Sequence, residues 1–243
     1  MLTKLITKGV VSVEYSQEAG NDGITPPTTA DGTQVGDHQL KKTTPVRPEI
    51  AGNSRPEAPF LPPSTKKYTL VMDLDETLVH YEDNGLVGQF FLRPFAQDFI
   101  DEMSKYYEVV IFTAALQDYA DWIIDRLDAN QNITHRLYRQ HTSVTQTNLH
   151  VKDLSKLGRD LSKTIIVDNI PENFQLQAEN GIFIKSWFHD PEDSALSEMM
   201  PLLREIAVKQ LPDVRAALRR FRDKMIENIR RGCLQPHLNL TIE

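Results

Sequence analysis

Cysteine is almost absent from this sequence, in which Cys233 is the one thiol among 243 residues. A single thiol cannot form a disulfide within the chain, so other interactions must stabilise the fold, as is usual for proteins of a reducing compartment. Cys233 lies in a polar stretch near the C-terminus. We interpret it as a bystander and not as a nucleophile.

Long apolar runs and an excess of basic residues are also missing. No run approaches the roughly 20 residues that span a bilayer, and Lys4 and Lys8 interrupt the apolar N-terminus, so a secretory signal is not expected. These lysines and nearby hydroxyls leave a weak transit peptide open, although Glu14 and Glu18 argue against one. The net charge of −7 lacks the basic footprint of nucleic-acid binding. We expect no membrane partner, no direct nucleic-acid partner, and a nuclear or cytoplasmic location.

The first part of the chain differs from the rest in composition. Residues 16–65 are rich in glycine, proline, threonine and aspartate, and few large apolar residues occur there. Such a stretch buries too little surface to offset chain entropy, and its prolines stiffen it locally. We predict a disordered or extended linker over residues 1–64 and one folded domain over residues 65–221. The short apolar group 10–13 has no evident partner and is left unassigned.

The last segment has helical periodicity and a basic face. Its apolar stripe consists of Val214, Leu218, Phe221, Met225 and Ile229, and its arginines are Arg215, Arg219, Arg220, Arg222, Arg230 and Arg231. One interpretation is a surface helix that packs on the domain. The other is partner docking through this Arg-rich helix, with an acidic protein as the partner. Residues 222–243 hold the end of the helix and a tail.

Apolar runs of strand type alternate with segments of helical spacing through the domain. Residues 68–73 form a nearly continuous apolar run ending in acids, as expected of a strand buried on both faces of a parallel sheet. The predicted strands are residues 68–73, 108–112, 164–167 and 181–186, and the predicted helices are 94–106, 116–127 and 193–210, the last interrupted at Pro201. This alternation predicts an α/β fold with a doubly wound, mostly parallel sheet.

Polar side chains stand where three of these predicted strands end. They are Asp73 and Asp75, Thr113, and Asp168 with Asn169. In open α/β sheets, ligands bind outside the carboxyl ends of the strands, so these side chains should meet at one edge. Taken singly, each would be interpreted as a turn residue or a helix cap. Their joint occurrence favours a single site.

The pair Asp73 and Asp75 suits phosphate chemistry. One carboxylate can attack phosphorus and form an acyl-phosphate, while the other protonates the leaving group and later deprotonates water. Carboxylates crowded in this way repel each other and a phosphate, and a hard divalent cation such as Mg²⁺ relieves the repulsion. Asp168 and Asn169 could complete the oxygen shell of that cation.

Charge on a transferring phosphoryl group also needs hydrogen-bond donors. Thr113 is the hydroxyl candidate, and Lys152 is the ammonium candidate. Alone, Thr113 would be a helix cap and Lys152 a solvated surface lysine. Because Thr113 and Lys152 occur in order with the acidic residues along the chain, a role in the site is favoured over these two interpretations.

The motifs resemble those of the haloacid dehalogenase superfamily, in the form found in the NLI-interacting-factor-like phosphatases of the RNA polymerase II C-terminal domain. The resemblance runs from about residue 68 to about residue 221 and rests on several motifs in the right order. These are residues 73–80 (DLDETLVH), 111–114 (IFTA), 151–162, 165–169 (IIVDN) and 186–188 (SWF). It implies a superfamily fold with a minimal cap insertion, and a Mg²⁺-dependent protein serine/threonine phosphatase that forms an aspartyl-phosphate.

The resemblance also implies a role for each matching residue. Asp73 would be the nucleophile and a metal ligand, and Asp75 the general acid and base with its backbone carbonyl on the metal. The remaining implied roles are phosphoryl binding by Thr113 and Lys152, metal ligation by Asn169 with support from Asp168, and substrate contact by Arg139. The implied substrate is phosphoserine or phosphothreonine in a protein, with the polymerase tail as one candidate.

One departure bears on the substrate. Small members of the family carry a β-hairpin between the first two motifs that forms a pocket for proline, and here the stretch between His80 and Arg93 is short. We expect this hairpin to be reduced to a turn around Asn84 and Gly85. Two other functions stay open: a non-catalytic binding module of the same fold, similar to a mitochondrial import receptor, and a small-molecule phosphatase. The lack of a large cap argues against the latter.

Overall fold

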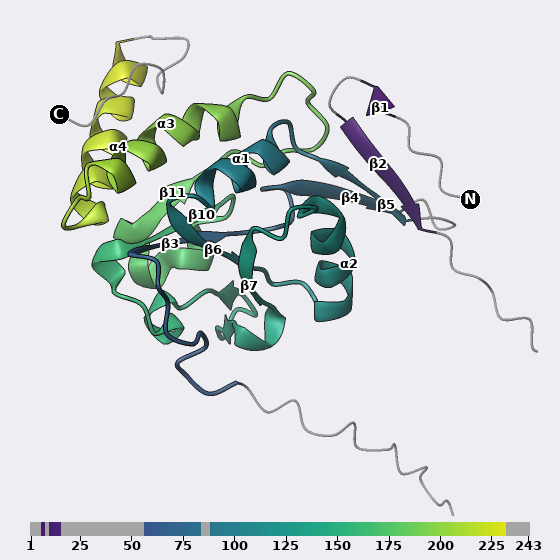
Figure 1. Ribbon diagram of the computed structural model, residues 1–243, viewed down its shortest axis with the longest axis horizontal. Coiled ribbons are helices and arrows are strands. Elements are labelled where there is room, and N and C mark those ends of the chain that lie inside the picture. The colour runs from purple at the N-terminus through teal and green to yellow at the C-terminus, as the bar shows by residue number, and fades with distance from the viewer. Residues whose placement is uncertain (1–5, 8–9, 16–55, 84–87, 232–243) are drawn as a thin grey trace, which may run out of the picture.

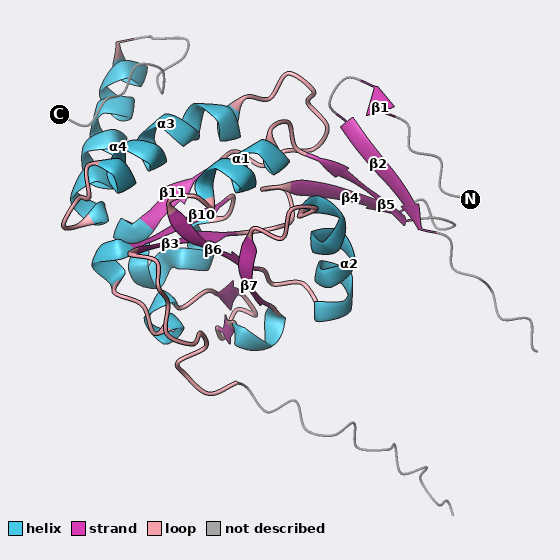
Figure 2. Cartoon of the chain, viewed as in Figure 1, coloured by secondary structure: helices cyan, strands magenta, loops and turns pink. Residues whose placement is uncertain are grey.

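The computed structural model describes residues 6–7, 10–15, 56–83 and 88–231. A five-stranded sheet lies at the centre of this part of the chain, with helices flanking it (Figures 1 and 2). Its strands are β3 (Tyr68–Met72), β6 (Tyr107–Phe112), β7 (Ile133–Leu137), β10 (Thr164–Asp168) and β11 (Gly181–Phe183). All neighbours are parallel, in the order β11-β10-β3-β6-β7. The predicted doubly wound α/β fold is confirmed.

The chain changes direction across the sheet at β3. It continues to β6 and β7 on one side of β3 and later fills the other side with β10 and β11. Ligand sites in open α/β sheets lie at such a switch point. Strands β3, β6 and β10 are buried along their whole length, as their apolar runs predict. Strand β7 is not predicted from the sequence, because Thr134, His135 and Arg136 give it the polarity of a loop.

Two apolar cores lie on opposite faces of the sheet, because successive strand residues point to opposite sides. Tyr68, Leu70 and Met72 belong to the larger core, and Val71 belongs to the smaller one. The larger core is covered by α1 (Ala96–Met103), α2 (Gln117–Leu127), α3 (Ala195–Val208) and α4 (Val214–Arg230). The smaller core is covered by short 3-10 helices, chiefly η2 (Leu154–Leu157) and the kinked η4 (Pro171–Asn180).

A small antiparallel ribbon leads to Lys152, which lies at the carboxyl edge of the central sheet. Strands β8 (Ser143–Val144) and β9 (His150–Val151) pair with each other, and Lys152 follows β9 directly. Two further 3-10 helices, η1 (Arg139–His141) and η3 (Leu161–Lys163), complete the connections. The ribbon therefore sets where Lys152 enters the domain.

Helix α3 runs through Pro201 without a break, so the predicted interruption there is wrong. Proline removes one backbone hydrogen bond from a helix, and packing can outweigh that loss. Pro201 is exposed, and the opposite face of the helix is buried in the larger core. The buried residues are Leu196, Met199, Leu202, Leu203 and Ile206.

Helix α4 packs on the domain beside η4 and β11. Val214, Ala217 and Leu218 are buried. Among its arginines, Arg219 pairs with Glu179 of η4, and Arg222 Nη1 donates to the carbonyl oxygen of Gly181 at 3.2 Å. Part of the basic face is thus used within the domain.

A second, antiparallel sheet stands beside α2 and has the order β1-β2-β5-β4 (Figure 1). Its strands are β1 (Ile6–Thr7), β2 (Val10–Tyr15), β4 (Val79–Asp83) and β5 (Gly88–Leu92). Strands β4 and β5 pair from Val79↔Leu92 to Asp83↔Gly88. The expectation of a hairpin reduced to a turn is therefore wrong for these strands, because alternate side chains such as Phe90 are buried against the larger core. The turn at Asn84 and Gly85 lies outside the described residues.

Residues before β3 contact two parts of the fold, the antiparallel sheet and the smaller core. Residues 10–13, left unassigned above, belong to β2 and pair with β5. Near the domain, Phe60 N donates to the carbonyl oxygen of Lys156 at 2.8 Å, and Leu61 is buried in the smaller core. Packing on the domain therefore begins before residue 65. Within the described residues, none of the helices combines the length and the apolar character that crossing a bilayer requires.

Candidate active site

The polar residues at the strand ends lie together at the carboxyl edge of the sheet. Asp73 follows β3, Thr113 follows β6, and Asp168 is the last residue of β10. Because β3 lies between β6 and β10, the three strand ends are neighbours. The amide of Asp73 donates to the carbonyl oxygen of Val167 at 3.0 Å, which extends the ladder to the first carboxylate.

Lys152 is buried between two carboxylates. Its Nζ lies 2.5 Å from Asp73 Oδ1 and 2.6 Å from Asp168 Oδ2, and its side chain is 0% exposed. Burial lowers the pKa of Lys152, but attraction by Asp73 and Asp168 more than offsets this, and the net pKa is raised. Lys152 therefore stays an ammonium, with its charge directed at the site.

Backbone and side-chain contacts hold this lysine and Asp168 in place. The amide of Lys152 donates to the carbonyl oxygen of Asn173 at 2.6 Å. Asp168 Oδ1 accepts from the amide of Ile170 at 2.8 Å and from Asn173 Nδ2 at 3.2 Å. Asn173 is a residue that sequence reasoning missed, since it belongs to none of the motifs and meets the site only through the fold of η4.

The loop after β3 directs the Asp73 carboxylate. Thr77 Oγ1 donates to Asp73 Oδ2 at 2.9 Å and lies 3.4 Å from Asn169 Oδ1. Glu76 has a φ of 54°, and its carbonyl oxygen accepts from the amide of Trp187 at 2.9 Å. A residue other than glycine adopts a positive φ only where its surroundings enforce it. Thr77 stands in the motif, but its hydroxyl was not assigned a role.

Arg93 holds the loop after β3 in place through a hydrogen bond to its backbone. It is 1% exposed, and its guanidinium donates to both carboxylate oxygens of Asp193, at 2.7 and 2.8 Å. Its third bond, from Nη1, reaches the carbonyl oxygen of Thr77 at 3.1 Å. A bidentate, charge-assisted pair of this kind stabilises the contact and also fixes the relative orientation of the two side chains. Sequence reasoning missed Arg93 because a lone arginine gives no sign that it is buried.

Asp75 lies in a different environment from Asp73. Burial raises the pKa of Asp75, the hydrogen bond from Tyr119 lowers it and the nearby Asp73 carboxylate raises it, so that the net pKa is about 6. Tyr119 OH donates to Asp75 Oδ1 at 2.6 Å, and Thr113 Oγ1 lies 3.4 Å from Asp75 Oδ2. Asp75 can thus carry a proton at mildly acidic pH. Tyr119 lies in the predicted helix 116–127, and nothing in the sequence indicated its contact with Asp75.

The donor set at this edge fits a hard divalent cation. Burial, and then the Asp73 carboxylate, raises the pKa of Asp168. Asp73 and Asp168 share the one ammonium of Lys152, and the Asp75 carboxyl lies beside them. Asn169 Nδ2 donates to Ser186 Oγ at 2.9 Å, which turns Asn169 Oδ1 toward Thr77 and Asp73. Carboxylate and amide oxygens are the ligands that Mg²⁺ prefers.

Arg139 lies at the rim. It is exposed, and its Nε donates to the carbonyl oxygen of Ala114 at 2.6 Å, while its amide donates to that of Ala115 at 3.0 Å. These bonds place the arginine beside the loop that carries Thr113. Its guanidinium bonds that loop, and Lys152 bonds the carboxylates, so the two cations occupy different parts of the site.

Comparison with known proteins gives consistent matches. A family model described as NLI interacting factor-like phosphatase matches residues 68–215. The "Probable C-terminal domain small phosphatase" of Dictyostelium discoideum is 41% identical over 176 residues, which cover 66% of this chain and 56% of that protein. "CTD small phosphatase-like protein 3" of Caenorhabditis elegans is 41% identical over 204 residues, covering 76% and 70%.

Other matches cover less of their proteins or are more distant. "CTD small phosphatase-like protein 2" of Dictyostelium discoideum is 38% identical, and the match covers 74% of this chain but 33% of that protein. The chain thus spans about a third to a little over half the length of the two Dictyostelium relatives. The solved structure of Fcp1, an essential RNA polymerase II CTD phosphatase, has a TM-score of 0.47 at 14% identity and covers 69% of this chain and 67% of its own.

Proposed function

The chain belongs to the NLI interacting factor-like phosphatase family, and on this premise we propose that it is a Mg²⁺-dependent protein serine/threonine phosphatase with an aspartyl-phosphate intermediate. The observation that carries the proposal is the buried Lys152 ammonium between Asp73 and Asp168, with the partly buried Asp75 carboxyl beside them. This arrangement gives one nucleophile, one proton donor and one fixed cation at the same sheet edge.

The first chemical step uses two carboxyl groups in different protonation states. An Asp73 oxygen attacks phosphorus, the bond from phosphorus to the ester oxygen breaks, and the Asp75 proton goes to that leaving oxygen. Lys152 and Thr113 would bind the phosphoryl oxygens and stabilise their charge, while Arg139 at the rim would contact substrate.

The second step regenerates both groups. Asp75, now ionised, takes a proton from a water molecule, whose oxygen attacks phosphorus and releases inorganic phosphate from Asp73. Thr77 and Lys152 hold the Asp73 oxygens throughout, through bonds of 2.9 and 2.5 Å. Asp73, the Asp75 carbonyl and Asn169, supported by Asp168, would hold Mg²⁺, which supplies positive charge against the phosphoryl oxygens when bound.

The proposed substrate is a phosphoserine or phosphothreonine in a protein. The insertion after the first motif is a hairpin and not an enclosing cap, and an open site suits a protein segment better than a small metabolite. The relatives are named as phosphatases of a C-terminal domain or CTD, and we propose the C-terminal domain of RNA polymerase II, which the motif resemblance implies, as one candidate substrate. Docking of a partner on α4, the absence of direct nucleic-acid and membrane binding, and a nuclear or cytoplasmic location belong to the same proposal.

Replacing the nucleophile tests the mechanism. We expect Asp73→Asn to lower turnover of an aryl phosphate and of a phosphoserine peptide by about a thousandfold or more, as loss of a nucleophile does. The measurement is phosphate release by the purified chain in Mg²⁺ and after exhaustive chelation. Asp98→Asn, an exposed aspartate of α1, is the control and should keep full activity.

The same assay separates the alternatives. An Asp73→Asn chain that hydrolysed the aryl phosphate at the normal rate would rule out the aspartyl mechanism, and full activity after chelation would rule out the metal. A wild-type chain that turned over sugar phosphates but no phosphopeptide would be a small-molecule phosphatase. A chain that bound the phosphopeptide without turnover would be a binding module.

A further inference from the structure

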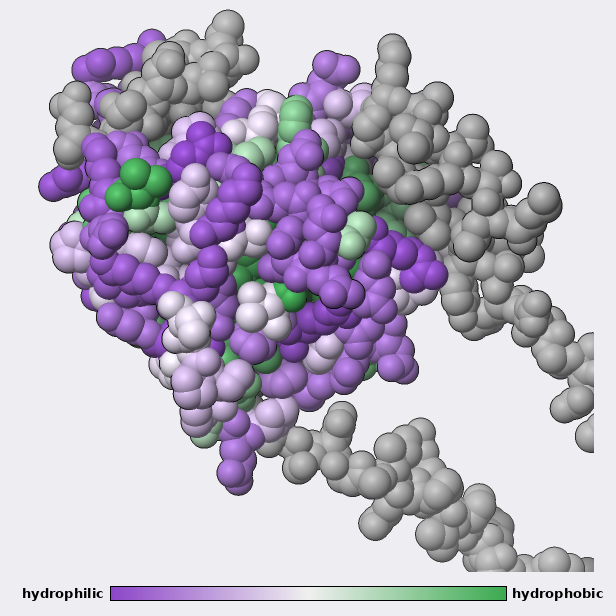
Figure 3. All heavy atoms as spheres, in the orientation of Figure 1, coloured by the Kyte–Doolittle hydropathy of each residue, from purple (hydrophilic) through white to green (hydrophobic). Residues whose placement is uncertain are grey.

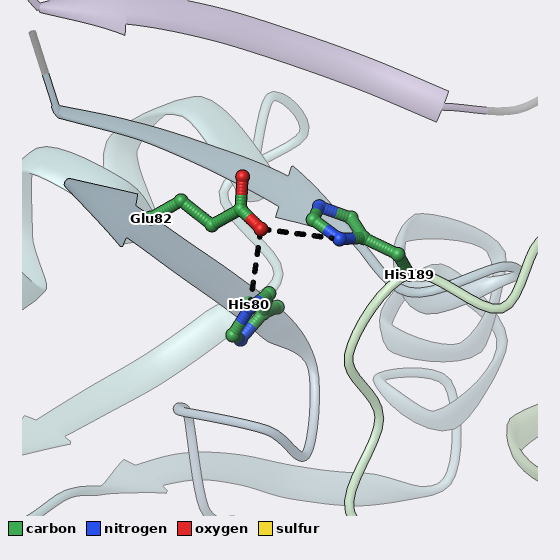
Figure 4. A group of neighbouring side chains, drawn as sticks. All are labelled: His80, Glu82 and His189. Atoms are coloured by element: carbon green, nitrogen blue, oxygen red, sulfur yellow. Dashed lines mark ion pairs between the residues drawn. The ribbon is translucent and has the colours of Figure 1, made fainter. Parts of the chain in front are cut away.

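A second cluster of potential ligands lies outside the phosphatase site. His80 and Glu82 are two apart on β4, so their side chains share one face of the strand. His189 comes from the segment after β11 and meets them from the other side (Figure 4). One ligand atom from each of the three residues lies within 4.8 Å of the other two.

The contacts within the cluster converge on one carboxylate oxygen. Glu82 Oε1 lies 3.3 Å from His189 Nδ1 and 3.8 Å from His80 Nε2. A tetrahedral zinc ion with ligands about 2.0–2.2 Å away holds them about 3.3 Å from each other. The separations of 3.3 and 3.8 Å are therefore near the spacing that such an ion imposes, and all three ligand atoms lie within 4.8 Å of one another, so zinc would draw them closer together.

The other nitrogen of His80 has a partner of its own. His80 Nδ1 lies 3.2 Å from Glu76 Oε1. In metal sites, the ring nitrogen that does not bind the metal usually donates to a carboxylate, which fixes the tautomer and the ring orientation. When Nδ1 donates to Glu76, Nε2 carries the lone pair, and this nitrogen lies 3.8 Å from Glu82 Oε1, where a cation could bind both atoms.

Aromatic rings hold the two imidazoles edge-on. The ring centroid of His189 lies 4.0 Å from that of Phe91, and the centroid of His80 lies 5.2 Å from that of Phe188. His189 also has a φ of 135°. Backbone strain of this kind persists only where the surroundings enforce it, and it concentrates at functional sites.

We propose that His80, Glu82 and His189 bind one zinc ion. Two imidazole nitrogens and one carboxylate are a zinc donor set, whereas Mg²⁺ prefers oxygen ligands alone, so this site is chemically distinct from the phosphatase site. The side chains of Glu82 and His189 are 45% and 38% exposed, which leaves the fourth position open to water.

The bound ion would join two parts of the fold. It links β4, which starts directly after the loop of Asp73 to Thr77, to the segment that precedes α3. That segment already bonds the loop through the amide of Trp187, which donates to the carbonyl oxygen of Glu76. Asp193 of the same segment pairs with Arg93, which in turn donates to the carbonyl oxygen of Thr77. Zinc would therefore hold the hairpin against the segment that precedes α3. Because such a ligand binds only the folded chain, it raises the stability of the fold by mass action.

Direct metal binding tests the proposal. The full chain is stripped of metal and dialysed against zinc in saturating Mg²⁺, which keeps the oxygen-rich phosphatase site in its Mg²⁺ form. We expect one zinc per chain, and a midpoint of thermal unfolding raised by about 5–10 °C at a hundredfold excess over the dissociation constant. His189→Asn and Glu82→Gln should abolish this uptake, and Glu76→Gln should weaken it about 10–100-fold.

A matched control comes from another histidine and acid pair. His135 Nε2 lies 3.3 Å from Glu108 Oε1 without a second histidine, so His135→Asn should leave zinc uptake unchanged. A cooperative thermal unfolding transition of each metal-free variant, followed by circular dichroism, is the check that the variant is folded. Equal uptake by the wild type and His189→Asn would overturn the proposal. No zinc uptake by the wild type would overturn it too.

Discussion

Lys152 is a buried ammonium that two buried carboxylates share, with Nζ 2.5 Å from Asp73 and 2.6 Å from Asp168. At the scale of residues, this sharing defines the site, because neither carboxylate has the cation to itself. The second carboxylate makes the cluster negative and suits it to a metal, while the ammonium keeps it able to accept a phosphate. Two predictions concern single residues of this cluster.

The first is that removing the ammonium destabilises the fold as well as the reaction. Lys152→Met leaves Asp73 and Asp168 buried without their cation, and breaking a buried pair costs about 3–5 kcal/mol of unfolding free energy. We expect urea denaturation without metal to show this loss. The double variant Lys152→Met with Asp168→Asn should regain part of it, because one charge is gone. A double variant no more stable than the single one would contradict the charge argument.

The second prediction concerns pH. Burial raises the pKa of Asp75 from 3.8 to about 6, so the proton that it would give to the leaving group in the proposed mechanism is present below about pH 6 and is lost above it. We expect kcat/KM to fall as the pH rises through 6, approaching tenfold per pH unit. The measurement is a pH profile of aryl phosphate hydrolysis.

Tyr119 supplies the check on this assignment. Its hydroxyl donates to Asp75 Oδ1 at 2.6 Å and stabilises the ionised form. Tyr119→Phe should therefore raise the pKa of Asp75 and move the falling limb of the profile to higher pH. A profile that stayed in place, or moved to lower pH, would mean that another group sets this limb.

At the scale of elements, Arg93 joins segments that are distant in sequence. It lies between β5 and α1, bonds the carbonyl oxygen of Thr77 in the loop after β3, and pairs with Asp193 just before α3. The loop that carries Asp73 and Asp75 is thus braced by the start of one helix and by the segment leading to another. The geometry of the site depends on how these elements are tied.

We expect Arg93→Lys to lower kcat about 10–100-fold, since an ammonium cannot form the bidentate pair and a small displacement of catalytic groups has an effect of this order. The steady-state kinetics of aryl phosphate hydrolysis measure it. Arg204→Lys is the control, because Arg204 forms an exposed pair with Glu102 on the helices. Surface pairs contribute little, so that variant should behave as the wild type. Equal kinetics for both variants would show that the brace is dispensable.

At the scale of the whole molecule, the domain starts to pack before its first strand. Leu61 is buried in the smaller core and Phe60 bonds Lys156, so residues 56–64 act as a strap under the sheet. The face shown in Figure 3 is mostly hydrophilic, with apolar side chains visible in patches between the charged ones. The buried apolar side chains form the two cores on the faces of the central sheet, and Leu61 belongs to the smaller one.

A truncation compares two starting points. A chain that begins at residue 56 keeps Leu61, and a chain that begins at residue 65 loses it. We expect the shorter chain to be less stable by at least about 1.5–3 kcal/mol, the contribution of one buried leucine. The midpoint of urea unfolding measures this. Equal midpoints would show that the strap adds nothing, and the full chain under the same conditions is the reference.

Much of the fold follows from local pattern. The runs that form β3, β6 and β10 are mostly apolar because both faces of the sheet are covered, and the residue types at their ends predict where the site lies. Local pattern does not predict strand β7 or the continuity of α3 through Pro201. Each depends on neighbours that are remote in sequence, which outweigh the polarity of β7 and the hydrogen bond that proline removes.

The sequence by itself determined the α/β class, the family motifs and the candidate residues from Asp73 to Asn169, because apolar period and residue type are local properties. Only the tertiary structure decided which groups touch them. The burial of Arg93, the bond of Tyr119 to Asp75 and the meeting of His189 with β4 are examples. Each brings together residues more than forty positions apart, and their distance depends on the path of the whole chain.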